Sequence, residues 1–121
     1  MRVGALLSLV GLFAAGCGPN CQSTCTHVFD PSECGIARPG IEPSEQINNC
    51  LTACEYALSQ PGEVGSYDPD TPNFSSGVEL ENERQAAAWM DCVWATAPDG
   101  SLSGSDECRA LDEGYCAPTN F

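Results

Sequence analysis

The fold of this chain is decided by two short segments of one pattern, CQSTC at residues 21–25 and CLTAC at residues 50–54. Residues i and i+4 of an α-helix lie on the same face, so each segment would present two sulfur atoms on one side of a helix. The two sulfurs of a segment would be separated by about 6 Å along the helix axis. Two such helices lying side by side can therefore be joined by two disulfides.

The expected hairpin leaves two pairings to choose between. Neighbouring helices usually pack antiparallel, which predicts the bonds Cys21–Cys54 and Cys25–Cys50. Parallel packing would instead pair Cys21 with Cys50 and Cys25 with Cys54. The arrangement resembles the twin C-x-x-x-C helical hairpins of the small mitochondrial Tim chaperones, although the 24 residues between the pairs exceed the usual loop of that family. The resemblance implies the hairpin architecture and no chaperone activity.

Four further cysteines, Cys34, Cys92, Cys108 and Cys116, are expected to bond among themselves. After residue 16 the chain has only 15 Leu, Ile, Val and Phe among 105 residues. So few apolar residues together with a large net charge are typical of a disordered chain. Disulfides can stabilise a small exported domain with such a small core. We therefore expect residues 17–121 to form one disulfide-stabilised domain.

Helical spacing of the apolar residues defines the two helices of the hairpin. The first is predicted to begin after Asn20, as its N-cap, and to end at Asp30-Pro31. The second is predicted to begin at Ser44, as its N-cap, and to end before Pro61-Gly62.

Two more helices are expected beyond the loop at residues 61–77. One is predicted over Glu79 to Ala97, and a short one is predicted after Ser103 or Ser105, with Gly114 at its C-terminal end. No segment shows the alternation of a strand. The predicted fold is small, all-α and disulfide-rich, with a helical hairpin, one longer helix, one short helix and long loops.

The N-terminal segment has the outline of an export signal. Met1-Arg2 precedes an apolar run of about 13 residues, which is shorter than the roughly 20 residues that span a bilayer as a helix. The sequence FAAGC at residues 13–17 resembles the lipobox of bacterial lipoprotein precursors, with Ala14 at a position where that family usually has Leu. The resemblance implies cleavage after residue 16, a diacylglyceryl group on the Cys17 sulfur and an acylated amino end. An ordinary signal peptidase site would instead release a soluble protein with Cys17 as a free thiol.

Cysteine number and the residue after Cys17 refine this expectation. Lipidation of one of the nine cysteines leaves eight that can all pair. Lipoproteins of the inner membrane often have Asp after the lipidated cysteine, whereas this chain has Gly18, which resembles the outer-membrane class. The sequence thus predicts a lipid-anchored protein of the bacterial cell envelope, at the outer membrane.

The charge of the chain excludes one class of partner. Seventeen acidic residues stand against four basic ones, which gives a net charge of −13, and there is no lysine. Such a surface repels nucleic acid phosphates and has no basic patch to offset the repulsion. We expect no nucleic acid partner.

Metal sites of two kinds are compatible with the residue types. Four thiolates at C-x-x-x-C spacing can bind zinc, although an oxidising compartment favours disulfides over thiolates. Oxygen ligands for calcium are offered by six residues around the loop at 61–77, but their order does not match an EF-hand, and a solvated acidic loop is the expectation. These residues are Asp68, Asp70, Asn73, Glu79, Glu81 and Glu83.

No catalytic set is recognisable. His27 is the only histidine, and a Cys25/His27 dyad would need a free thiolate and side chains on one helix face, whereas i and i+2 point apart. We therefore expect His27 to lie on the surface. Trp89 and Trp94 are about 140° apart around a helix axis, so at most one can point fully into the core. The other is either a partly exposed anchor for a partner or is packed under the acidic loop.

The sequence thus favours a non-enzymatic interaction or structural module without a cofactor, a metal site or catalytic residues. The alternative is a metal-binding protein, for zinc or calcium, or a thiol-redox protein of the envelope. A count of free thiols together with metal analysis discriminates between these classes, because a module needs neither a free thiol nor a bound metal.

Overall fold

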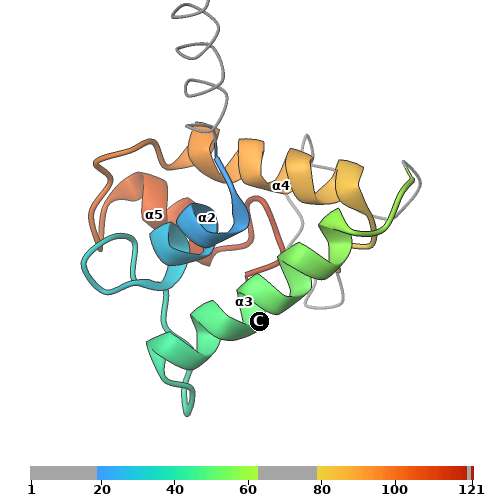
Figure 1. Cartoon of the computed structure of the whole chain (residues 1–121). Helices are drawn as coiled ribbons and strands as arrows, with labels where there is room; N and C mark the ends of the chain where they lie inside the picture. Colours follow the sequence, from blue (N-terminus) through green and yellow to red (C-terminus); the bar gives the residue numbers. More distant parts are fainter. Residues whose placement is uncertain (1–18, 63–78, 120) are drawn as a thin grey trace, which may run out of the picture.

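The computed structural model describes residues 19–62, 79–119 and 121 (Figure 1). Within these residues there are four helices, α2 (Cys21–Phe29), α3 (Pro43–Leu58), α4 (Glu83–Thr96) and α5 (Asp106–Asp112). The same residues contain no strand beyond an isolated bridge between Arg38 and Ile41. The predicted small all-α, disulfide-rich fold is confirmed. No helix of the described part combines the length and the apolar character that a membrane span requires.

Helix α2, the second shortest, packs against two other helices. Figure 1 shows α4 along one side of the molecule and α3 crossing diagonally opposite it, with α2 between them. The helix pairs with the most extensive contacts are α2 with α3, α2 with α4, α3 with α4, and α4 with α5. The end of α3 meets the start of α4, where the N–H of Glu83 donates to the carbonyl of Gln60 at 2.8 Å. Helix α2 is therefore covered on two sides.

Helix α2 begins and ends where the sequence predicts. The Asn20 side chain accepts from the Ser23 N–H at 2.8 Å, and the Ser23 hydroxyl accepts from the Asn20 N–H at 3.2 Å, which completes a capping box. At the other end, the Asp30 carboxylate accepts from the N–H and the hydroxyl of Ser32. The bond from the Ser32 N–H, and after it the bond from the Ser32 hydroxyl, holds the pKa of the Asp30 carboxyl below its usual value.

The predicted starts of α3 and α4 are wrong. Helix α3 begins at Pro43, and Ser44 is inside it rather than at its cap. Proline is favoured at the first helical position, because it has no N–H that would need a partner there. Helix α4 begins at Glu83 rather than Glu79, because the Asn82 side chain accepts from the N–H groups of the next residues at 3.1 Å and caps the helix.

Of the two candidate caps for the last helix, Ser105 is the one used. Its hydroxyl accepts from the Cys108 N–H at 3.2 Å. Gly114 follows the C-cap of α5 with a φ of +114°, a conformation that favours glycine. The predicted C-terminal end of α5 is confirmed.

The C-terminal segment completes the core, a role that its sequence pattern does not predict. The fully buried Trp89 donates its indole N–H to the carbonyl of Pro118 at 3.1 Å. The ring of Phe121 packs edge-on against Phe29 and Trp89, with centroid distances of 6.0 and 5.7 Å. A guanidinium N–H of Arg38 also donates to the Thr119 hydroxyl at 3.0 Å. The end of the chain therefore runs through the middle of the fold (Figure 1).

One buried side chain opposes the stability of this core. Gln46 in α3 is fully buried, and neither its amide nitrogen nor its amide oxygen has a hydrogen-bond partner. Leaving buried polar groups unpaired costs about 1–3 kcal/mol. Gln46→Met, which approximately conserves volume, is expected to raise the free energy of unfolding by about that amount in denaturant titrations.

Gln85 provides the matched control for this prediction. It is also buried and its amide nitrogen is also unpaired, but its side-chain oxygen, unlike that of Gln46, accepts from the Glu81 N–H at 2.8 Å. Gln85→Met removes that bond and is expected to lower the stability. A loss of stability in Gln46→Met as large as that in Gln85→Met would contradict the assignment of Gln46 as unpaired.

Candidate functional site

The eight cysteines predicted to form disulfides are brought together in the structure as four bonds. The bonds are Cys21–Cys54, Cys25–Cys50, Cys34–Cys108 and Cys92–Cys116. Their Cα–Cα distances are 5.8, 5.8, 5.3 and 5.7 Å. These values fall within the usual range of about 4.4–6.8 Å, so the backbone positions fit the bonds.

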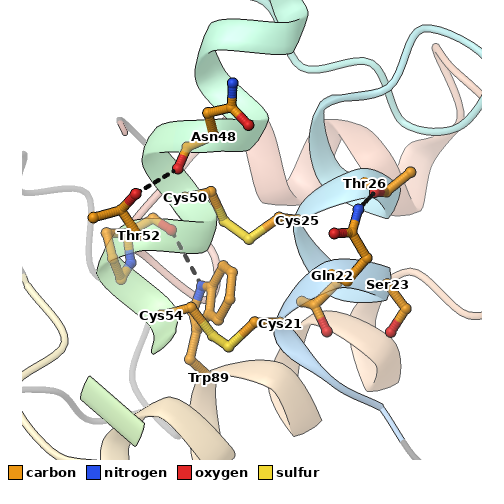
Figure 2. Close-up of a disulfide and its surroundings, with 12 residues drawn as sticks. Cys21, Gln22, Ser23, Cys25, Thr26, Asn48, Cys50, Thr52, Cys54 and Trp89 are labelled. Carbon is orange, nitrogen blue, oxygen red and sulfur yellow. Dashed lines mark hydrogen bonds between the residues drawn. A yellow bond between two sulfur atoms is a disulfide. The ribbon is translucent and has the colours of Figure 1, made fainter. Parts of the chain in front are cut away.

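The first two bonds join α2 to α3. Figure 2 shows them one helical turn apart between the two helices, with Trp89 beside them. Both bonds have the antiparallel pairing, and the parallel alternative is wrong. Cys25, Cys50 and Cys54 are completely buried, and Cys21 nearly so. These disulfides therefore form part of the core.

The other two bonds attach the remaining elements. Cys34 lies in the loop after α2 and Cys108 in α5, so their bond fixes α5 to the hairpin. Cys92 lies in α4 and Cys116 in the C-terminal segment, so their bond holds that segment against α4. The prediction that these four cysteines bond among themselves is confirmed.

The disulfides bear directly on the zinc and redox alternatives. Each of the eight sulfurs is bonded to another sulfur and is therefore not a thiolate, the form that binds zinc or attacks a disulfide. Across residues 19–62, 79–119 and 121, no three His, Cys, Asp or Glu side chains are grouped as a metal site would require.

Two predicted sites involve residues outside those that the structure describes. Cys17, the predicted lipid attachment point, is one of them, and its acylation stays a prediction. Asp68, Asp70 and Asn73 of the calcium hypothesis are also outside. Glu79, Glu81 and Glu83 are described and exposed to solvent.

His27 is buried, and the expectation of a surface histidine is wrong. Its exposed fraction is 1%. The prediction took only the face of α2 that bears the cysteines to be buried. Helix α2 also contacts α4, so a second face of it is buried. Thr24 and His27, three residues apart, form a second buried stripe on α2. The helical spacing of these two polar residues is the sequence signal that indicates the second stripe.

Both ring nitrogens of His27 contact oxygen atoms. Nδ1 is 2.7 Å from Oε1 of Glu33, in the turn after α2, and Nε2 is 2.7 Å from the carbonyl oxygen of Ala97, at the end of α4. The Trp94 ring stacks on the imidazole with a centroid distance of 4.2 Å and an interplanar angle of 15°. The Trp94 indole N–H donates to the Thr24 hydroxyl at 2.9 Å.

The two tryptophans differ in burial as predicted. Trp89 is fully buried, whereas Trp94 is partly exposed. Trp94 has one ring face against His27 and its N–H bonded to α2. Trp94 thus holds α4 against α2. Its role as an anchor for a partner stays a prediction.

A depression of about 270 Å³ lies beside the Cys34–Cys108 bond. Two charged side chains line it, Arg109 and Asp112. Arg109 is paired with Asp106, and Asp112 lies 3.1 Å from Arg38. The charged groups of the depression are therefore already paired.

Comparison with known proteins gives no family for this chain. No protein-family model, curated protein or solved structure matches it.

Proposed function

We propose that the protein is a lipid-anchored, non-enzymatic structural or interaction module of the bacterial cell envelope. The observation that supports this proposal most strongly is the use of the cysteines. The chain has nine, and eight of them are bonded in pairs within the domain. Cys17 is thereby left without a partner in the disulfide framework, and it follows the apolar segment at the position of the lipobox cysteine.

The distance from Cys17 to the fold suits an anchor. Helix α2 begins at Cys21, so only residues 18–20 separate its first residue from Cys17. An extended chain spans about 3.3–3.6 Å per residue, which gives a link of roughly 10–15 Å. A lipid on Cys17 would hold the N-terminal end of α2 close to the bilayer.

The form of the domain suits a module that presents a fixed surface. Four disulfides connect its helices, and its acidic character disfavours binding to anionic partners. Several large apolar side chains nevertheless face solvent, among them Tyr56 on α3 with an exposed fraction of 62% and Leu102 with 65%. Apolar side chains on a stable scaffold are what binding to another protein uses.

Cys17→Ser is expected to abolish lipidation, because the thioether can form only on the cysteine sulfur. The wild-type protein should fractionate with membranes, and its N-terminal peptide should carry more than one acyl chain. At about 0.8 kcal/mol per buried methylene, two chains make the attachment effectively permanent. The variant should accumulate as unprocessed precursor or as a soluble product.

Gly18→Asp provides the matched control. It leaves Cys17 in place, so lipidation should persist, while the protein should shift from the outer to the inner membrane. Acyl chains on the Cys17→Ser protein, or an unmodified Cys17 in the wild-type protein, would overturn the proposal.

A further inference from the structure

Three separate parts of the chain meet at the His27 ring. The imidazole comes from α2, Glu33 from the turn that follows it, and Ala97 and Trp94 from α4. Glu33 is the charged group in contact with the ring, and its side chain is 34% exposed. Helix α4 contributes the carbonyl of Ala97 and the neutral Trp94 ring, and no hydrogen bond or ion pair from α3 or α5 to this ring is found among the described residues.

The two oxygen partners dictate the number of protons at this site. A carbonyl oxygen only accepts, so Nε2 must carry a proton that it donates to Ala97. A neutral imidazole has one N–H, so Nδ1 would then direct a lone pair at the Glu33 carboxylate, 2.7 Å away. That arrangement is repulsive. The contact is attractive only when the pair holds one more proton, on Nδ1 or on the carboxyl group.

The surroundings favour this extra proton as a positive charge on the ring. Ala97 is the C-cap of α4, so its carbonyl lies at the negative end of the helix dipole. The face of Trp94 covers the ring, and an aromatic face attracts a cation. The carboxylate of Glu33 completes an ion pair. Burial of the ring excludes the water that would otherwise replace these partners.

We propose that His27 and Glu33 form a pH-sensitive latch that closes α2 and the following turn onto the end of α4. With the proton in place, both ring nitrogens donate and the three parts are joined. Loss of the proton leaves two acceptors facing each other, and one of them is on a buried ring. The proton is bound in the folded state and stabilises it, so by linkage the stability is present at low pH and is lost as the pH rises.

The sequence makes this latch easy to isolate experimentally. His27 is the only histidine, and histidine is the side chain that ordinarily titrates between about pH 5 and about pH 8. The eight cysteines of the described part are in disulfides and do not titrate. The inference does not depend on acylation of Cys17, so it can fail while the proposed function holds, and the reverse is also possible.

The test is denaturant unfolding of the mature, disulfide-bonded protein at about pH 6 and about pH 9, below and above the pKa of about 6.5 that histidine has in an unfolded chain. For the wild-type protein, the folding equilibrium constant should fall roughly 5- to 150-fold from the lower to the higher pH, the cost of an unpaired buried polar group. Glu33→Gln should remove this fall, because the amide can accept from a protonated Nδ1 and can donate to an unprotonated one.

Glu55→Gln is the matched control, since Glu55 is an exposed acid on α3 and should leave the fall unchanged. The imidazole ¹⁵N signals of the single histidine should also show protons on both nitrogens at about pH 6 and on one at about pH 9. A wild-type protein equally stable at both pH values, or a Glu33→Gln variant with the same fall as the wild type, would overturn the latch.

Discussion

Reduction of the four disulfides is expected to unfold the domain. The apolar core is small, with 15 Leu, Ile, Val and Phe among the 105 residues after residue 16, and several of its buried positions are the cysteines themselves. Ordering the backbone costs about 1–2 kcal/mol per residue, which so small a core cannot offset alone. The helical circular dichroism signal should fall sharply when a reductant is added at neutral pH.

The individual bonds are expected to contribute unequally. Cys34–Cys108 joins residues 74 apart in sequence, and Cys92–Cys116 joins residues 24 apart. In the chain-entropy model these loops correspond to roughly 4.5 and 3.5 kcal/mol of stability. Replacing both cysteines of Cys34–Cys108 by Ala should therefore lower the free energy of unfolding more than the same change in Cys92–Cys116. Unchanged helicity after full reduction would show that the core is sufficient without the disulfides.

Truncation of Trp89 is the second change with a large expected effect. Its side chain is fully buried, its indole N–H is bonded to Pro118, and its ring contacts Phe121. Trp-to-Ala changes in cores cost about 3–5 kcal/mol, because a cavity remains and packing contacts are lost. Trp89→Ala should lower the free energy of unfolding by that amount and release the C-terminal segment, which limited proteolysis can detect.

Two further variants separate the loss of the hydrogen bond from the loss of packing, and the buried position from an exposed one. Trp89→Phe retains an aromatic ring but loses the bond to the Pro118 carbonyl, and its loss of stability should be smaller than that of Trp89→Ala. Tyr56→Ala, at a position that is 62% exposed, should change the stability by no more than about 0.5 kcal/mol. Equal effects of Trp89→Ala and Tyr56→Ala would contradict the packing described for the C-terminal segment.

The hairpin could be predicted from the sequence because its signal is local. The i, i+4 spacing of Cys21 with Cys25 and of Cys50 with Cys54 fixes the sulfurs on one helix face, and hairpin geometry then selects the pairing. The capping box at Asn20 is local as well. The start of α4 was misplaced because the acidic residues from Glu79 fit a first helical turn, whereas Asn82 provides the actual cap.

The His27 site and the C-terminal segment could not be predicted in the same way, because both depend on contacts between distant residues. Ala97 is 70 residues from His27 in sequence, and Pro118 is 29 residues from Trp89. A single sequence does not indicate which helix covers the second side of α2. The pairing of Cys34 with Cys108 is equally non-local, and only the set of four remaining cysteines could be named in advance.

We propose that eight cysteines hold the fold together as disulfides while Cys17 carries the lipid anchor. Peptide mapping of the unreduced mature protein by mass spectrometry, after alkylation of free thiols, tests it most directly. We expect no alkylated cysteine, an acylated N-terminal Cys17, and the peptide with Cys21 and Cys25 linked to the peptide with Cys50 and Cys54. An alkylated thiol among the eight, a mature protein that begins at another residue, or a bond from Cys17 to any of the eight would contradict it.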